Sequence, residues 1–521
     1  MIMKKLIIVL SVLLAFGLES CNNWLVLKPE SQIVLEDFWQ TESQATSVLA
    51  GCYRGLTADP CIERMIVWGE LRSDNLVAGN STRNDMLKVL NTDITPTNTY
   101  ADWSSFYSVI NYCNTFLYYA PSVVNKDQNF TTTKLHTLEA EALTIRALSY
   151  FYLVRAFQEV PLILNPSISD AQNYLIPKSS ERVILDQIIV DLLTAQKYAK
   201  TSYGTAALNK GRVTLNAVNA LLADVYLWDQ QYSNCVDMCN LVMADQTLQL
   251  VAGDKVLNNV FYTGNSTESI FELQFNINIQ SNNNVNKLYG IDSSPLGELA
   301  YAYYLGPKGI LNPFNYQPTT LNESSNDIRQ TNSFGTLTNG TGYPIYKYSL
   351  LQCTENSDGS VTPVYRNSAT TANWILYRLS DVILMKAEAL AELDRSDDDL
   401  KQSLNLVNMT YLRSNITADS LYFNNYSDKG SIEDLVLRER QRELLFEGKR
   451  WFDLMRVVRR KNDPTAILKY IGPKLTGGAI QTQQMSVMNA LYMPILQSEL
   501  QINTNLKQNP FYIDTNLSSN N

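Results

Sequence analysis

Glu443 and Glu447 are the residues whose type and spacing could most directly perform chemistry. They lie four residues apart in E-R-Q-R-E-L-L-F-E-G-K-R-W-F-D-L, and glycoside hydrolases work with a facing pair of carboxylates. The same stretch places many charges among bulky side chains such as Phe446 and Trp451. Such charges must pair, because an unpaired buried charge is strongly destabilising. We therefore predict a structural salt-bridge network, with the hydrolase as the sharper alternative. Its other members would be Arg438, Glu439, Arg440, Arg442, Arg450, Asp453 and Arg456.

Histidine and cysteine offer little further chemistry. The only histidine is His136, so a serine triad, a histidine-bound zinc ion or a histidine acid–base would all depend on it. It lies in a helical pattern, where we expect a structural or surface role. Cys235 and Cys239 are one helical turn apart, but no second pair or nearby histidine completes a metal site. We predict buried free thiols, no metal and no cofactor, with a Cys52–Cys61 disulfide as the alternative in an exported chain.

The overall charge argues against a nucleic-acid partner. The 521-residue chain has a formal net charge of -9, whereas phosphate binding needs clustered lysine and arginine. One basic cluster, R-V-V-R-R-K at residues 456–461, is interpreted as a solvated helix end.

The elements that must position these residues are mainly helices. Apolar residues recur at helical spacing over residues 35–53, 102–119, 135–157, 180–199, 213–228, 232–244, 375–393 and 400–412. Pro121 is expected to close the second of these helices. The pairs at 213–244 and 375–412 resemble degenerate tetratricopeptide repeats, which stack to bury a continuous core. An ordinary helical bundle is the alternative.

Residues from about 248 to 373 have a different texture. Helical periodicity fades there, and Asn, Ser, Thr, Gly, Pro and Tyr dominate. Residues 270–275 alternate like a strand. Long irregular segments within compact proteins are usually functional. We therefore predict a loop-rich insertion within one helical domain.

The first 20 residues have the form of an export signal. Two lysines precede an apolar run over residues 6–16, which is too short to span a membrane. The sequence Leu18-Glu19-Ser20-Cys21 resembles the bacterial lipobox, in which the cysteine becomes the lipidated N-terminus. We expect a signal peptide at 1–20 and a mature body at 21–521, tethered to a membrane by acyl chains on Cys21.

Four passages together resemble one family, the SusD/RagB nutrient-binding outer-membrane lipoproteins of Bacteroidetes. They are C-N-N-W-L from Cys21, R-A-L-S-Y-F-Y-L-V-R-A-F from Arg146, Y-R-L-S-D-V-I-L-M-K-A-E-A-L from Tyr377, and the charged stretch from Glu439. Their order and spacing cover nearly the whole chain, and the fourth is the most specific. The resemblance implies a mainly α fold, a SusD-like superhelix of tetratricopeptide-like pairs. It also implies binding and not bond cleavage, a lipid-anchored place on the outer surface of the outer membrane, and a TonB-dependent (SusC-like) transporter as partner.

The resemblance implies an oligosaccharide ligand. Sugar rings have apolar C–H faces and a rim of hydroxyls, so they suit exposed aromatic side chains beside polar groups. Two regions and one neighbouring residue offer these, and the predicted ligand contacts are Trp68, Arg72, Asp74 and Asn75, then Tyr301, Tyr303, Tyr304, Phe314 and Tyr316, and finally Trp374. The structural alternatives are a local turn at the polar pair and packing of the aromatic residues onto the scaffold.

Three other functions stay open. A RagB-like relative would bind peptide in place of sugar. A glycoside hydrolase would need two carboxylates facing each other across a cleft, about 5–10 Å apart. A purely structural tetratricopeptide scaffold would have no concave aromatic pocket in the insertion.

Overall fold

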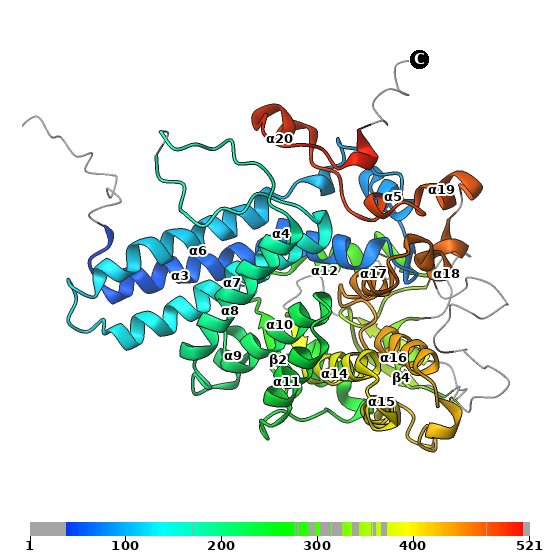
Figure 1. The fold of residues 1–521 in the computed structure, drawn as a ribbon. Helices are drawn as coiled ribbons and strands as arrows, with labels where there is room; N and C mark the ends of the chain where they lie inside the picture. Colours follow the sequence, from blue (N-terminus) through cyan, green and yellow to red (C-terminus); the bar gives the residue numbers. More distant parts are fainter. Residues whose placement is uncertain are drawn as a thin grey trace, which may run out of the picture.

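The fold is known from a computed structural model. It describes residues 38–513, except 170, 277, 279–280, 291–296, 303–313, 315–322, 324–325, 336–342, 356, 358–360, 366–371 and 476. Cys21 therefore lies outside the described residues. Helices dominate the described part (Figure 1). None of its helices combines the length and the apolar character needed to cross a membrane.

The first half of the chain supplies the longest helices. In order these are α3 (Glu42–Leu56), α4 (Asp59–Ile66), the π-helix η1 (Val67–Leu71), α5 (Asn84–Leu90), α6 (Ser104–Val123), α7 (Thr132–Phe157), α8 (Glu181–Tyr198), α9 (Ala206–Gly211), α10 (Leu215–Trp228) and α11 (Tyr232–Met243). The helices α3, α6, α7 and α8 run side by side (Figure 1). Helix α7 is buried on nearly all sides from Ala140 onward, as its apolar residues around the whole helix require.

The second half of the chain adds further helices to this helical core and ends in the short helices α18 to α20. Its helices are η4 (Leu257–Thr263), α12 (Asn283–Tyr289), α13 (Arg329–Ser333), α14 (Leu379–Leu393), α15 (Asp397–Ser414), α16 (Lys429–Glu443), α17 (Arg450–Lys461), α18 (Leu468–Ile471), α19 (Gly478–Gln484) and α20 (Gln497–Ile502). The pairs α10–α11 and α14–α15 pack against each other through α11 and α14. The predicted fold of stacked helix pairs is confirmed.

The described residues contain three two-stranded antiparallel sheets, two of which join the insertion to the rest of the domain. They pair β1 (Leu76–Ala78) with β3 (Leu299–Tyr301), β2 (Ser269–Leu273) with β6 (Trp374–Arg378), and β4 (Leu350–Glu355) with β5 (Val361–Tyr365). The strand predicted at 270–275 is β2. In two of the sheets, one strand belongs to the insertion and the other lies at or beyond its border.

Three predicted helix boundaries are wrong. The helix expected over residues 35–53 is α3, which begins only at Glu42 because Thr41 caps its N-terminus. The helix expected from residue 375 begins at Leu379, because the preceding residues form the buried strand β6 and pair with β2. A short apolar run cannot be assigned to strand or helix by periodicity alone. Helix α6 passes through Pro121 and ends at Val123. Proline disrupts a helix by removing one donor and crowding the preceding turn, but the last turn of α6 stays packed because Ala120 and Val123 are buried.

Helix η1 meets the turn between α16 and α17 at two glycines. Gly448 has φ +70° in this turn, and Phe446 has φ +66°. A Cβ atom at Gly69 would collide with the carbonyl of Gly448. This close approach of two backbones places the side chains after η1 against the start of α17.

Candidate functional site

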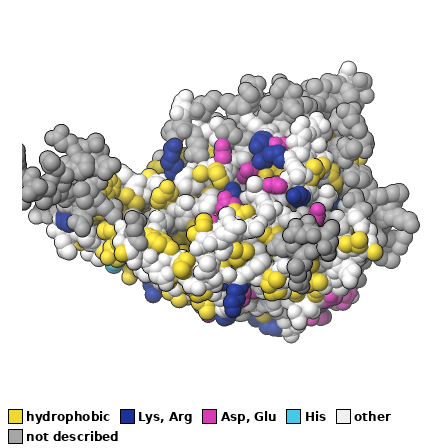
Figure 2. All heavy atoms as spheres, turned by 90° about the horizontal axis from the view of Figure 1, so that it is seen from above, with side chains coloured by type: hydrophobic (Ala, Val, Ile, Leu, Met, Phe, Trp, Pro, Cys, Tyr) yellow, Lys and Arg dark blue, Asp and Glu magenta, His cyan; other side chains and the backbone are white. Residues whose placement is uncertain are grey.

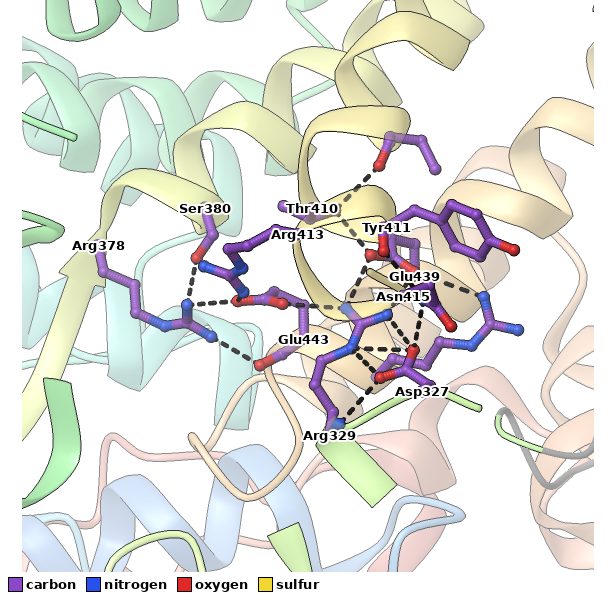
Figure 3. A network of polar contacts seen from close by, with 12 residues as sticks. Asp327, Arg329, Arg378, Ser380, Thr410, Tyr411, Arg413, Asn415, Glu439 and Glu443 are labelled. Carbon is purple, nitrogen blue, oxygen red and sulfur yellow. Dashed lines mark hydrogen bonds and ion pairs between the residues drawn. The ribbon is translucent and has the colours of Figure 1, made fainter. Parts of the chain in front are cut away.

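The charged stretch of the fourth passage is a buried ionic network (Figure 3). Arg378, at the junction of β6 and α14, bonds Glu268 and Glu443 at 2.6 Å and Glu447 at 2.7 Å. Arg329 bonds Glu443 at 3.0 Å from the other side. These carboxylates and both arginines are at most 9% exposed as side chains. The network therefore joins β6, α13 and α16 from within.

This environment does not suit Glu443 and Glu447 for acid–base chemistry. Burial opposes their ionisation, but the surrounding arginines and Lys347 outweigh it and lower the pKa of both carboxyls. A glycosidase acid needs the opposite shift, since it must hold a proton near neutral pH. Both side chains are also at most 3% exposed. The predicted structural salt-bridge network is confirmed.

The basic cluster at 456–461 is part of a second network, so its interpretation as a solvated helix end is wrong. Arg456 bonds Glu388 at 2.7 Å and is 3% exposed. Arg459 bonds Glu181, and Arg460 bonds Glu392, each at 2.7 Å. Only the last residue, Lys461, is exposed in this run. Arg456 is buried, and Arg459 and Arg460 are partly buried, because acidic residues of α14 and α8 lie opposite α17.

The first group of predicted ligand contacts lies in the core. Trp68 is 1% exposed, and its indole donates to the Tyr100 carbonyl at 2.9 Å. Asp74 bonds Arg450 at 2.8 Å. Asn75 donates to Glu70 at 2.6 Å. The expectation that these side chains form an exposed sugar platform is wrong. Aromatic residues of α6 and α7 pack on Trp68, and Arg450 of α17 pairs with Asp74.

Arg72 belongs to the same buried group and differs from the other buried arginines. It is 2% exposed, and its guanidinium lies 4.3 Å from the centre of the Trp451 ring. Among the described residues it has no carboxylate partner, and its Nε has no hydrogen-bond partner. Burial lowers the pKa of the Arg72 guanidinium to about 10. It therefore faces an aromatic ring and not a ligand surface.

Three of the predicted aromatic contacts near the insertion are also buried. Tyr301 and Phe314 pack on Phe334, with ring centres 4.4 and 5.8 Å away. Trp374 stacks on Tyr348 at 5.3 Å. All three predicted residues are at most 3% exposed, so the expectation of an exposed platform is wrong for them. The remaining predicted residues, Tyr303, Tyr304 and Tyr316, lie outside the described residues.

His136 and the described cysteines have structural surroundings. The His136 ring lies 4.5 Å from that of Tyr198. Cys52 and Cys61 are buried free thiols, so the alternative of a disulfide between them is wrong. Cys52 instead lies beside Cys113 of α6. Within the described residues, no group of three histidine, cysteine or acidic side chains is placed to hold a metal ion.

Two buried groups beside η1 have pKa values near neutrality. Burial raises the pKa of the Glu70 carboxyl to about 7 and lowers that of the Lys474 ammonium to about 7. Lys474 donates to the carbonyls of Leu71 and Ser73 at 2.5 and 2.8 Å. Such values are typical of catalytic groups, but Glu70 is fully buried and Lys474 is 8% exposed. Through these two hydrogen bonds, Lys474 links the end of η1 to the segment that leads into α19.

An open groove of about 600 Å³ lies between α5 and α19. Each wall is one helix face, with positions spaced by three, four and seven residues. The residues of both walls and their ends are Asn84, Leu87, Lys88, Asn91, Asp93, Gly477, Ile480, Gln481 and Gln484. The walls touch where Gln481 donates to the Asn91 carbonyl at 2.7 Å. The groove has the size of a small-molecule site.

The groove lies on a largely uncharged face of the molecule. Helices α5, α19 and α20 are at the top of Figure 1, so the view from above in Figure 2 looks onto this side. Neutral polar surface dominates there, acidic and basic side chains lie beside one another, and hydrophobic side chains are scattered. The charged side chains that Figure 2 shows on this face are of both signs.

Two family models match most of the chain. Residues 23–227 match the family described as starch-binding associating with outer membrane, and residues 300–512 match the SusD family. The chain belongs to the SusD family. The second match includes both ionic networks except Glu268 and Glu181, so the most specific motif of this SusD-family protein lies in its core.

Relatives and solved structures extend over nearly the same length. A SusD-like protein of Formosa agariphila is 26% identical over 482 residues, covering 87% of this chain and 91% of that protein. A SusD-like protein of Bacteroides ovatus is 25% identical, covering 91% of this chain and 86% of that protein. A SusD superfamily structure from Bacteroides vulgatus has a TM-score of 0.70 at 20% identity, covering 91% of this chain and all of that one. The last comparison bears on the fold alone.

The sequence reasoning missed the groove entirely. Its α5 wall comes from N-D-M-L-K-V-L-N and its α19 wall from G-G-A-I-Q-T-Q-Q. Each is a short polar helix face, and nothing in such a pattern distinguishes it from an ordinary solvated surface. The only signal was indirect, since both stretches are rich in uncharged amides.

Proposed function

We propose that this SusD-family protein captures oligosaccharide at the cell surface and passes it to a TonB-dependent outer-membrane transporter without cleaving it. The observation that carries the proposal is the open groove between α5 and α19. Its amide side chains each offer hydrogen-bond donors and an acceptor, as sugar hydroxyls require. The family descriptions, which name starch binding and association with the outer membrane, support the same function.

Two features favour binding over hydrolysis. Among the described residues that line the groove, Asp93 is the only carboxylate, whereas glycoside hydrolysis uses a pair. The closely spaced carboxylates Glu443 and Glu447 are buried and held by cations. Neither can donate a proton to a ligand on the surface.

The place of the protein in the cell follows from its N-terminus in this proposal. Cys21 carries the lipid, and the signal at 1–20 is removed. The body then stands on the outer face of the outer membrane beside its transporter. Tyr303, Tyr304 and Tyr316 remain proposed ligand contacts of the insertion.

A glycan and peptide array on the purified mature protein tests the binding function. We expect glycans to be retained, and chromatography of the bound oligosaccharide after prolonged incubation should return it intact. Retention of peptides alone would refute sugar capture, and shortened sugar products would refute a pure binding role. Cell fractionation of Cys21→Ala tests the anchor, since the variant should leave the outer-membrane fraction.

A further inference from the structure

The two walls of the α5–α19 groove differ from ordinary packed helices. Helix α5 buries Met86, Val89 and Leu90 toward the core and turns its polar face to the groove. Helix α19 has no buried residue at all. A helix without a buried face gains little from packing, so α19 adds a wall to the groove and nothing to the core.

The groove contains polar side chains that are not used by the fold. In the described part of the chain, the side chains of Asn84, Lys88, Asp93 and Gln484 make no hydrogen bond and no ion pair with one another or with other residues. They are partly or fully accessible to solvent. Each of these groups can hydrogen-bond a ligand without breaking a contact within the protein. The groove is therefore suited to a ligand that forms hydrogen bonds.

The charge and the apolar surface of the groove limit the class of ligand that it can bind. Of the described residues that line the groove, Lys88 and Asp93 are the charged ones, and their opposite charges cancel. An anionic ligand would need a net positive site, because phosphate, sulfate and carboxylate groups are bound chiefly by cations. Ile480 is 70% exposed, and with Leu87 it offers a small apolar surface for the C–H face of a sugar ring.

We propose that the α5–α19 groove binds an uncharged, hydroxyl-rich stretch of the captured oligosaccharide, held by Asn84, Gln484 and their neighbours. This inference rests on the proposed function and adds the residues that hold the ligand and the class of ligand. None of the described lining residues is aromatic, so hydrogen bonds carry the recognition. Binding should therefore change little with salt, since no charge is neutralised.

The test compares neighbouring glutamines of one helix. Gln484 lines the groove, whereas Gln483 on α19 is exposed and does not. A neutral glycan found on the array is titrated by calorimetry into the full mature protein and into Gln484→Ala, Asn84→Ala, the double variant and Gln483→Ala. We expect about tenfold weaker binding for each groove variant, the effect of losing one good hydrogen bond to a ligand, and parent-like binding for Gln483→Ala.

The outcomes separate this inference from the proposed function. If the parent binds a neutral glycan and all variants match it, the groove assignment is wrong while sugar capture stands. If it binds only uronic-acid or sulfated glycans, with Lys88→Ala abolishing binding and salt weakening it, the neutral class is wrong. If it binds no glycan, both fail. Unchanged melting curves of the variants show that altered binding does not arise from unfolding.

Discussion

Two buried arginines of this protein should differ strongly in their response to the same substitution. Arg378 is 1% exposed and has three carboxylate partners within 2.7 Å. Arg72 is 2% exposed and has no carboxylate partner among the described residues. Methionine resembles the arginine stem in length and carries no charge. We therefore expect Arg378→Met to be strongly destabilising and Arg72→Met to be nearly neutral.

The magnitudes follow from what each substitution leaves behind. Removing Arg378 leaves three buried carboxylates short of a cation, and breaking a buried ion pair from one side destabilises by about 3–5 kcal/mol. Removing Arg72 forfeits a cation–π contact of roughly 1–2 kcal/mol. The substitution also removes the cost of burying a charge, the cost that lowers the pKa of the Arg72 guanidinium to about 10. The net change in the free energy of unfolding should therefore stay within about 1 kcal/mol.

Differential scanning calorimetry measures both effects. An unfolding entropy of about 2.1 cal/mol/K per residue makes about 1 kcal/mol/K for a chain of 521 residues. Each kcal/mol therefore shifts Tm by about 1 °C. Arg378→Met should lower Tm by about 3–5 °C and Arg72→Met by no more than about 1 °C. Arg395→Met is the exposed control, since that side chain is 61% exposed beside Asp399.

A double variant tests whether the stability lost in Arg378→Met arises from buried carboxylates that no longer have a cationic partner. Glu447→Gln removes one of the three, so Arg378→Met and Glu447→Gln together should lose about 0.5–3 kcal/mol less than the sum of the single changes. Equal Tm values for Arg378→Met and the Arg395→Met control would refute the reasoning. So would a strict sum in the double variant.

Three further changes test the core around this network. Burial opposes ionisation of Asp381, but its two cationic partners outweigh it and lower its pKa to about 2. The charge on Asp381 therefore adds about 2 kcal/mol of stability above pH 4 that is lost toward pH 2; urea titrations of Asp381→Asn should lack this loss. Burial raises the pKa of Glu70 to about 7. The stability that Glu70 contributes in its protonated form is therefore fully present below pH 4.5 and falls by about 3 kcal/mol as pH rises to 7. The free energy of unfolding of Glu70→Gln should rise relative to that of the parent over this range. A difference between the two that stays constant from pH 4.5 to 7.5 would contradict the assignment. Gly69→Ala should lower Tm by several degrees, because its Cβ would collide with Gly448, whereas Gly51→Ala, which has open space around it, should not.

The amino-acid sequence by itself determined the helical class, the paired helices and the ionic network. The helix pairs follow from apolar residues at helical spacing, which must bury one face whatever lies opposite. The network follows because Glu443 and its charged neighbours stand among bulky apolar residues, where charges have to pair. Both inferences use only residues close together in the chain, and both are confirmed.

Only the tertiary structure decided which side chains reach solvent. The local pattern predicted a surface site at Trp68 and Asp74. In the structure, Phe157 of α7 packs on Trp68, and Arg450, more than 370 positions away, pairs with Asp74. The groove likewise arises where α5 meets α19, nearly 400 residues later, with Gln481 reaching the Asn91 carbonyl. Exposure depends on what packs against a residue from distant parts of the chain, and local pattern carries no information about that partner.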